Sequence, residues 1–254
     1  LKSLSPDKVL YLGLLKSVLG YVNTAHYTYG ELSNEINAET GGIMCGVEVF
    51  DRADSVDEYR AFFGVKGKVM YPKTDVMFRM IREILNTSDV TDTRRLHEII
   101  SRVKSRAQSS LVSAGHSTAV LRAASYGSPM AAFQDAMAGI AYYQFIEKLD
   151  KEFEERKDEI IENLKSLMTE ILRPENLSVS YTGERESLET MQKQVRELKK
   201  TLHQEAVEPS PAPMICEKKN AGFMISGLMR LIESILWAGA LACGFMAAIW
   251  MVRV

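Results

Sequence analysis

Residues 14–43 contain one histidine and three glutamates whose spacing could hold a metal ion. Glu31, Glu35 and Glu39 recur at every fourth residue, so a helix would place them along one stripe, shortly after His26. Zinc sites use closely spaced imidazoles or thiolates, and calcium sites use a compact loop of alternating oxygen ligands. Neither pattern is present, so the sequence favours an acidic, solvated helix face over a metal site.

The remaining histidines, His97, His116 and His203, are isolated. His97 precedes Glu98, but neither H-E-x-x-H nor H-x-x-E-H occurs anywhere in the sequence. His116 lies within SAGHS, which differs from the G-x-S-x-G of a serine-hydrolase nucleophile and falls in a predicted helix. We therefore predict no catalytic residues and no metal ligands in this chain, and its substrate-binding residues stay undefined.

One predicted helix is strongly basic and has a single acidic residue, Glu98, between its first and last cations. Its cations are Arg94, Arg95, Arg102, Lys104 and Arg106. Such a stripe could bind nucleic acid or line a chamber for acidic ligands. It lacks interleaved aromatic residues and a glycine-rich phosphate loop, so a solvated or interdomain face is favoured. The net charge of -2 adds no general attraction, and we expect no nucleic-acid partner.

Hydrophobic periodicity predicts a mainly helical chain with a few strands. Strands are predicted at 43–49 and 63–71, joined by the charged stretch 51–61, and again at 176–183. Helices are predicted at 5–20, 28–40, 74–86, 91–117, 127–150, 151–172 and 186–202. This order predicts an α+β fold in which helices pack on a mostly antiparallel sheet. Three strands are few for so many helices, so we expect the sheet to have partners outside this sequence.

Composition divides the chain into a domain at 1–205, a linker at 206–226 and an apolar tail at 227–254. Prolines at every second position, Pro209, Pro211 and Pro213, are typical of an extended linker. Residues 234–252 are 19 residues without a charge, which as a helix would be ~28 Å long, about one bilayer core. The tail is therefore predicted as an apolar C-terminal helix: a transmembrane helix, a buried core helix or an aberrant terminus.

Cysteine usage and the first residues bear on location. Cys45, Cys216 and Cys243 are far apart and form no C-x-x-C pair, which favours a reducing compartment. The polar start resembles no signal peptide, and a start without Met beside a helix indicates a piece of a longer protein. We expect a cytoplasmic location, with membrane association through 234–252 as the alternative.

Four segments together resemble one family of proteins. They are YLGLLKSVLGYVNTAHYTYGELSNEINAETGGI, the run from LNTSDVTDTRRLHEII to AYYQFIEKL, ENLSVSYTG and CEKKNAGF. They resemble the presequence-protease and falcilysin branch of the pitrilysin/insulinase zinc metallopeptidases, over about residues 4–226. The resemblance implies the peptidase-associated region: the third of four repeated α+β domains, in a protein whose two halves close around a peptide chamber.

The resemblance also implies that a metal motif has been lost. In that family an inverted H-x-x-E-H motif precedes a run similar to Ser17-Val18-Leu19. If the repeats align in this way, Leu12 and Lys16 stand in place of the histidines and Leu15 in place of the general-base glutamate. Leucine cannot ligate zinc, and Lys16 would repel it. We therefore expect a catalytically silent domain without zinc, the metal belonging to the catalytic domain of the full-length family member.

These points predict a non-catalytic segment of a presequence-protease-like zinc metallopeptidase that degrades peptides. The segment would form part of the chamber wall, with the catalytic half of the peptidase and unstructured peptides as partners. After residue 226 the sequence no longer resembles the family, so the fourth domain is expected to be missing and independent activity is not expected. The alternative is a membrane-tethered interaction module, which rests on the apolar tail alone.

Overall fold

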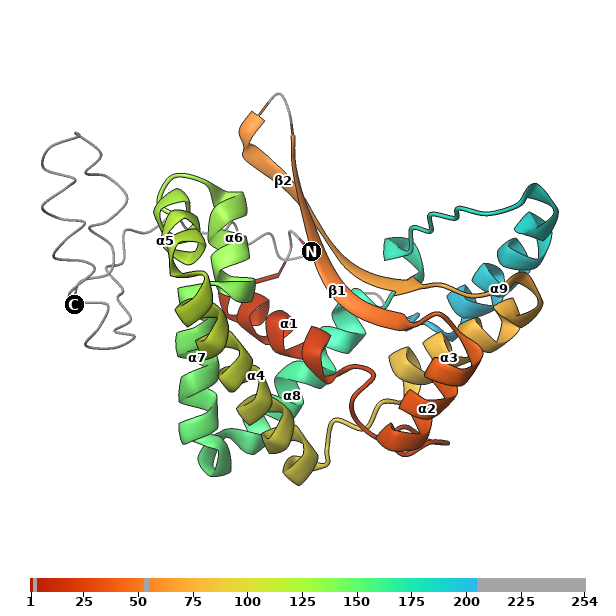
Figure 1. Cartoon of the computed structure of the whole chain (residues 1–254), viewed down its shortest axis with the longest axis horizontal. Coiled ribbons are helices and arrows are strands. Elements are labelled where there is room, and N and C mark those ends of the chain that lie inside the picture. The colour runs from red at the N-terminus through yellow and green to blue at the C-terminus, as the bar shows by residue number, and fades with distance from the viewer. Residues whose placement is uncertain (2–3, 53–54, 205–254) are drawn as a thin grey trace, which may run out of the picture.

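The computed structural model describes residues 1, 4–52 and 55–204 (Figure 1). Its helices and strands follow the order α1 Pro6–Val18, α2 Tyr29–Glu39, β1 Ile43–Arg52, β2 Ser55–Gly67, α3 Thr74–Thr87, α4 Thr93–Ser113, α5 Gly115–Ala124, α6 Pro129–Ala138, α7 Ile140–Lys151, α8 Phe153–Ile171 and α9 Leu188–Thr201. Short 3-10 helices lie at Tyr71–Lys73, Pro174–Asn176 and Arg185–Ser187. The predicted α+β class is confirmed.

Helix α1 lies at the centre of the helical layer. It packs against α4, α6, α7, α8 and strand β1, while α2, α3 and α9 form a second group at the other end of the hairpin (Figure 1). Pro6 and Asp7 suit the first turn of α1, since that turn tolerates proline and its positive dipole end favours an acidic side chain. Because helices surround it, α1 is buried on nearly every side.

Strands β1 and β2 form an antiparallel hairpin whose alternation follows the period of two. Cys45 pairs with Val65 and Val47 with Phe63, and these side chains pack against the core. On the other face Phe50 is exposed, with its ring centroid 6.2 Å from that of Phe62. The hairpin therefore buries one face against helices and leaves the other open.

The hairpin is longer than predicted, because the stretch 51–61 was expected to be a loop. β1 continues to Arg52 and β2 begins at Ser55. The charged residues Glu58 and Arg60 take outward positions, while Tyr59 and Ala61 between them are buried. Charge on alternate positions is compatible with a half-buried strand, and this was the signal that the prediction missed.

The strand predicted at 176–183 is wrong. Residues 177–182 are irregular, Val179 is exposed, and the segment is held at its end by the hydroxyl of Tyr71, which accepts a hydrogen bond from the Glu184 amide at 2.9 Å. A strand needs a neighbouring strand for its backbone groups, and in the part of the chain that the structure describes the sheet consists of β1 and β2.

Two predicted helices are each divided into two. The helix predicted at 91–117 breaks at Ala114 (φ -132°, ψ 38°), which separates α4 from α5. The helix predicted at 127–150 breaks at Gly139 (φ -94°, ψ -154°), which separates α6 from α7. A Cβ atom at Gly139 would overlap the side chain of Asp135 and lie 2.9 Å from its Cα, so the turn requires glycine.

Asp135 uses the space left by Gly139. Its Oδ1 accepts a hydrogen bond from the Ile140 amide at 3.0 Å, which caps the start of α7. Its Oδ2 forms an ion pair with Arg122 of α5, with 2.5 Å between Nη1 and Oδ2. Both side chains are more than nine-tenths buried, so this pair ties α5, α6 and α7 together in the interior.

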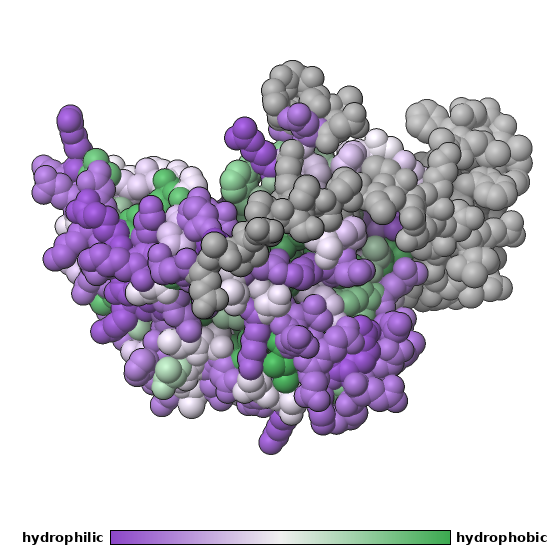
Figure 2. All heavy atoms as spheres, turned by 180° about the vertical axis from the view of Figure 1, so that it is seen from behind, coloured by the Kyte–Doolittle hydropathy of each residue, from purple (hydrophilic) through white to green (hydrophobic). Residues whose placement is uncertain are grey.

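The outer surface is mainly polar. Figure 2 shows the face opposite to that of Figure 1, on which hydrophilic residues predominate and hydrophobic ones are scattered. Among the helices that the structure describes, none is both long and apolar enough to cross a bilayer. The predicted linker at 206–226 and the apolar run at 234–252 lie outside the described residues.

Candidate functional site

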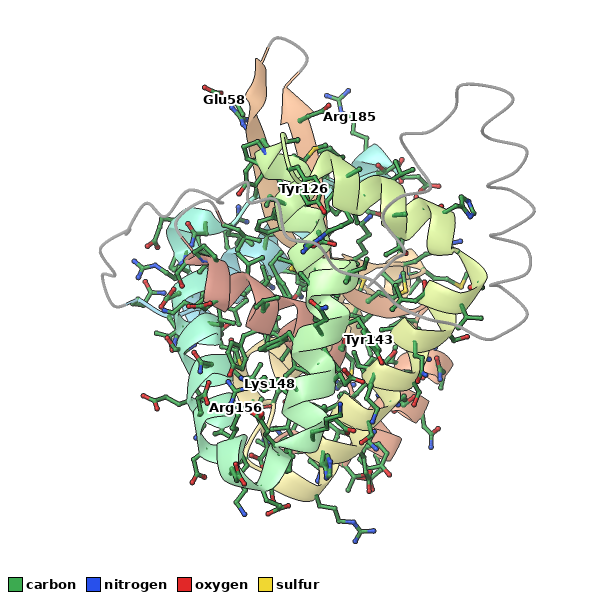
Figure 3. The ribbon with its side chains drawn as sticks, turned by 90° about the vertical axis from the view of Figure 1, so that its left-hand side faces the viewer. Glu58, Tyr126, Tyr143, Lys148, Arg156 and Arg185 are labelled. Atoms are coloured by element: carbon green, nitrogen blue, oxygen red, sulfur yellow. The ribbon has the colours of Figure 1, made fainter. Side chains whose placement is uncertain are left out.

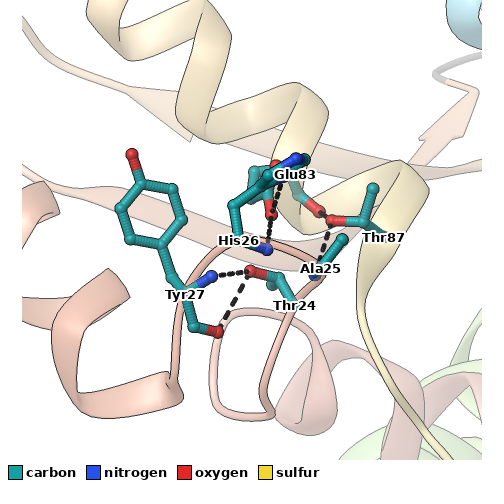
Figure 4. A network of polar contacts seen from close by, with 6 residues as sticks. All are labelled: Thr24, Ala25, His26, Tyr27, Glu83 and Thr87. Carbon is teal, nitrogen blue, oxygen red and sulfur yellow. Dashed lines mark hydrogen bonds and ion pairs between the residues drawn. The ribbon is translucent and has the colours of Figure 1, made fainter.

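His26 is part of a loop that is closed by a carboxylate (Figure 4). Glu83 of α3 accepts hydrogen bonds from the His26 amide at 3.0 Å and contacts its Nδ1 at 3.0–3.1 Å. Burial raises the pKa of the Glu83 carboxyl, but hydrogen bonds from Thr24, His26 and Thr87 outweigh burial and hold the pKa below its usual value. The loop before α2 is thus fixed to α3 by a structural carboxylate.

Each glutamate of the stripe has a partner of its own. Glu31 forms a capping box with Thr28, in which the Thr28 amide donates to its Oε2 at 2.9 Å. Glu35 lies 3.3 Å from Arg79, and Glu39 lies 2.9 Å from a lysine of the 3-10 helix at 71–73. The stripe is therefore a paired, solvent-facing helix face, as the sequence favours.

The other described histidines also have structural neighbours. His97 stacks on Phe153, with 4.3 Å between ring centroids, and its Nε2 lies 3.5 Å from Asp150. His116 is in the first turn of α5, and the His203 amide donates to the Leu172 carbonyl at 3.0 Å. Within the described residues, no group of three or more His, Cys, Asp or Glu side chains is arranged to hold a metal.

The segment of α1 that resembles a lost zinc motif does not fit the metal. Leu12 and Leu15 are completely buried in the core. Lys16 points instead to α6, where its Nζ donates to the Met137 carbonyl at 3.1 Å, and it lies 5.7 Å from the ring centroid of Tyr142. Two apolar side chains and a cation offer no ligand for zinc.

The basic residues of α4 separate into two groups. Arg95 is engaged: its guanidinium stacks at 3.7 Å over Tyr29 and donates to Glu98 at 3.0 Å. Lys104 is paired with Asp150 of α7. Arg102 and Arg106 lie on another side, where they line a groove with Lys16.

This groove is a hollow of about 580 Å³ formed where α1, α2, β1, α4 and the junction of α6 and α7 meet. Its apolar wall includes Leu19, Ile36, Ile84 and Val103, and its cations are Lys16, Arg102 and Arg106. We call it the cationic groove. Its volume is within the range of ordinary ligand pockets, about 300–1,000 Å³.

The floor of the cationic groove is held in place by Tyr142. Its hydroxyl donates to the Gly13 carbonyl at 2.8 Å, and a Cβ at Gly13 would lie 2.6 Å from the Tyr142 ring, so the close approach needs glycine. Burial raises the pKa of the Tyr142 hydroxyl and raises that of the Cys45 thiol to about 12. Both groups therefore stay neutral near pH 7.

The charge of the cationic groove is unbalanced. Among the described residues that line it none is Asp or Glu, and burial lowers the pKa of the Lys16 ammonium because desolvation disfavours the charged form. A second hollow of about 620 Å³, between α4 and α8, is different, since Arg94 there is accompanied by Glu98 and Glu154. Of these two hollows, the cationic groove is the one whose walls contribute positive charge alone.

Surface cations on α8 show the ordinary arrangement. Figure 3 shows Arg156 of α8 beside Lys148 of α7, and both approach Glu152. Arg156 also binds Glu159 at 2.7 Å, and Glu159 accepts from the Tyr11 hydroxyl at 2.7 Å. The Arg156 and Tyr11 hydrogen bonds lower the pKa of Glu159 to about 2, against a smaller effect of burial.

Sequence reasoning found two of the three groove cations but not the groove. Arg102 and Arg106 belong to the predicted basic stripe, for which a chamber for acidic ligands was one interpretation. Lys16 was considered only as a replaced metal ligand. The available signal was a lone lysine between Leu15 and Val18, in a helix that is otherwise apolar on several faces.

Comparison with known proteins places the chain in a class, that of peptidase-associated domains. The family model that matches residues 1–149 describes the associated region of peptidases of metallopeptidase family 16, subfamily C. This match covers more than half of the 254 residues, so the chain belongs to that peptidase-associated family. The predicted resemblance to presequence proteases is confirmed by the relatives as well.

Three relatives illustrate this. Protein HypA of Clostridium perfringens is 29% identical over 230 residues, which are 91% of this chain and 23% of that protein. The mitochondrial presequence protease of Yarrowia lipolytica is 29% identical over 168 residues, 66% of this chain and 17% of that protein. Presequence protease 1, chloroplastic/mitochondrial, of Arabidopsis thaliana is 26% identical over 177 residues, 68% and 16%. The chain thus spans less than a quarter of the length of these relatives.

Proposed function

We propose that this chain is the catalytically silent part of a presequence-protease-like zinc peptidase. In this proposal it forms part of the wall of a peptide chamber, helps to position unstructured peptides, and pairs with a catalytic region that holds the zinc. The observation that carries the proposal is the state of α1, in a chain whose family is peptidase-associated. Leu12 and Leu15, at the positions assigned to lost metal-site residues, are core residues with no exposed surface.

The hairpin supports a partner region. Among the described residues β1 pairs with β2 alone, so each strand has an outer edge without a strand neighbour. Edge strands present unpaired backbone donors and acceptors, which are templates for pairing with further chain. A catalytic region packed against this domain would have such an edge available, and the length of the relatives leaves room for it.

The test uses the purified 254-residue chain with zinc and a set of unstructured fluorogenic peptides. We expect no stoichiometric zinc by metal analysis and no turnover above the buffer rate. We further expect that mixing it with the separately produced catalytic half of the full-length protein restores peptide cleavage. Turnover or one tightly bound zinc per chain would refute silence, and failure of the mixture to cleave would refute the chamber role.

A second candidate function is a membrane-tethered interaction module. It is favoured by the uncharged run at 234–252, flanked by Trp237 and Trp250 near its ends. Carbonate extraction of membranes from cells that express the chain separates the two candidates. Quantitative release into the supernatant would remove the tether, and full retention in the pellet would support it.

A cytoplasmic, reducing location is part of the first proposal. Cys45 is a free thiol whose pKa burial raises, so it is unreactive in the folded state. The Yarrowia and Arabidopsis relatives are named mitochondrial and chloroplastic/mitochondrial, and fractionation of the source cells would decide between an organelle and the cytoplasm.

A further inference from the structure

The cationic groove contains positive charge that the described part of the protein does not neutralise. Lys16, Arg102 and Arg106 line one hollow, and its described lining contains no carboxylate. Elsewhere in the described chain, cations in comparable half-buried positions are paired: Lys8 with Glu170, and Lys104 with Asp150. A half-buried cation without a counter-charge has a desolvation cost that a bound anion would relieve.

The donors of these three side chains have capacity left for a ligand. An ammonium has three N–H donors, and Lys16 uses one of them on the Met137 carbonyl. The guanidinium of Arg102 lies 5.0 Å from the ring centroid of Tyr21, a contact that leaves its N–H edge available. Arginine forks bind carboxylates in a bidentate manner.

The rest of the lining is suited to the apolar body of a peptide residue. Leu19, Ile36 and Ile84 form the wall beside the cations, and Asn37 and Ser33 of α2 add polar groups at the side. A side chain of Glu or Asp, or a C-terminal carboxylate, has this combination of a charged end and an aliphatic stem. An inorganic anion would use the cations but leave the apolar wall in water.

We propose that the cationic groove binds a carboxylate-bearing segment of an extended peptide, through Lys16, Arg102 and Arg106. This inference rests on the proposed function, because peptides are taken from it as the ligand class. It adds a preference to that function: acidic residues of a peptide are held at this domain while the remainder of the peptide extends beyond it.

The test measures fluorescence anisotropy of a fluorescein-labelled, C-terminally amidated octapeptide with two central Glu residues, titrated with the full chain at low salt. Its matched probe carries Gln at both positions. We expect the Glu peptide to bind at least about tenfold more tightly than the Gln peptide, a difference of about 1.4 kcal/mol. Added salt should weaken the binding of the Glu peptide, since partly exposed charges are screened.

Three single variants, Lys16→Met, Arg102→Gln and Arg106→Gln, should each weaken binding of the Glu peptide about fivefold or more and leave the Gln peptide unchanged. Arg94→Gln is the matched control, because Arg94 lies on the same helix, is 91% exposed and pairs with Glu98. It removes the same charge and should change affinity less than about twofold. The two arginine variants keep the test valid if Lys16→Met does not fold.

Several outcomes would overturn the inference. They are equal affinity for the two peptides, an equal loss in Arg94→Gln, or complete displacement of the peptide by inorganic phosphate with no contribution from the apolar wall. The last result would define a general anion site. Binding needs neither zinc nor turnover, so a chain that binds the Glu peptide but fails to restore cleavage refutes the chamber role alone, and a chain that restores cleavage without this preference refutes the groove alone.

Discussion

Arg122 and Lys16 are cations packed against the same short region of chain, but their surroundings differ. Arg122 is met by Asp135 at 2.5 Å, and both are almost fully buried. Lys16 is met by a backbone carbonyl and an aromatic ring, with no carboxylate among the described residues of the groove that it lines. The difference separates a charge used to hold helices together from a charge that is available to a ligand. The following changes test this distinction, beginning with the largest expected effect.

Restoring the lost motif should destabilise the chain most. Leu12→His, Leu15→Glu and Lys16→His together place two polar groups in the core at about 1–3 kcal/mol each, and remove apolar burial of about 1.5–3 kcal/mol each. We expect a loss of more than about 5 kcal/mol in urea unfolding and no bound zinc.

The control for that variant uses exposed helical positions. Val112→His with Val120→Glu introduces similar side chains at sites that are 48% and 59% exposed and should cost less than about 1 kcal/mol in total. A triple variant that folds, binds zinc tightly and cleaves peptides would mean that the site in α1 is latent, and that the packing interpretation is wrong.

Removing the partner of Arg122 should give the next largest effect. Asp135→Asn keeps an oxygen for the Ile140 amide but removes the negative charge beside the buried guanidinium, which typically costs about 3–5 kcal/mol. Equilibrium urea unfolding measures it. The control is Glu154→Gln, which removes an exposed pair with Lys157 and should have little effect. Equal unfolding free energies for the two variants would contradict a structural role for the buried pair.

Lys16→Met should be tolerated far better than Lys104→Met. The first loses one hydrogen bond, about 0.5–1.5 kcal/mol, and is relieved of a desolvated charge, so the net change should be within about 1 kcal/mol. The second leaves Asp150, whose side chain is 12% exposed, without its lysine and should cost about 1–2 kcal/mol. If the two costs were reversed, Lys16 would be a structural cation and the comparison would fail.

The Lys16 variant also has a pH signature. Burial lowers the pKa of Lys16 below 10.5 in the folded state, so at alkaline pH the unfolded chain binds its proton more tightly. Stability from this group therefore rises with pH up to 10.5. We expect any advantage of Lys16→Met over the wild type in unfolding free energy to decrease as pH rises towards 10.5, measured by urea unfolding at a series of pH values.

Glu159→Gln should give the smallest effect. The pKa of Glu159 falls from 4.5 to about 2 on folding, so its stabilisation is fully present above pH 4.5 and is lost as pH falls to about 2. The pair is half-exposed and screened by water, so the contribution at neutral pH should stay below about 1 kcal/mol. The difference from wild type should disappear near pH 2, and a difference that grew on acidification would contradict this assignment.

Local patterns predicted the elements well, and long-range packing decided what they missed. The capping box of Thr28 and Glu31 and the alternation along β1 are readable from neighbouring residues. The break at Gly139 is not, because it depends on how Asp135 meets Arg122 of another helix. The predicted strand at 176–183 had the right period, but no neighbouring strand is present among the described residues. The cationic groove required five elements to meet.

Gly139 connects the two sides of this comparison. The helix break that it permits leaves the Met137 carbonyl near the end of α6, where helix carbonyls lack intrahelical partners and accept the Lys16 ammonium instead. The same break brings the Ile140 amide onto Asp135, the partner of Arg122. One residue without a side chain therefore acts as a joint: straightening it would release the clasp between α5 and α7 and, in the same movement, withdraw the acceptor that aims a lysine into the groove.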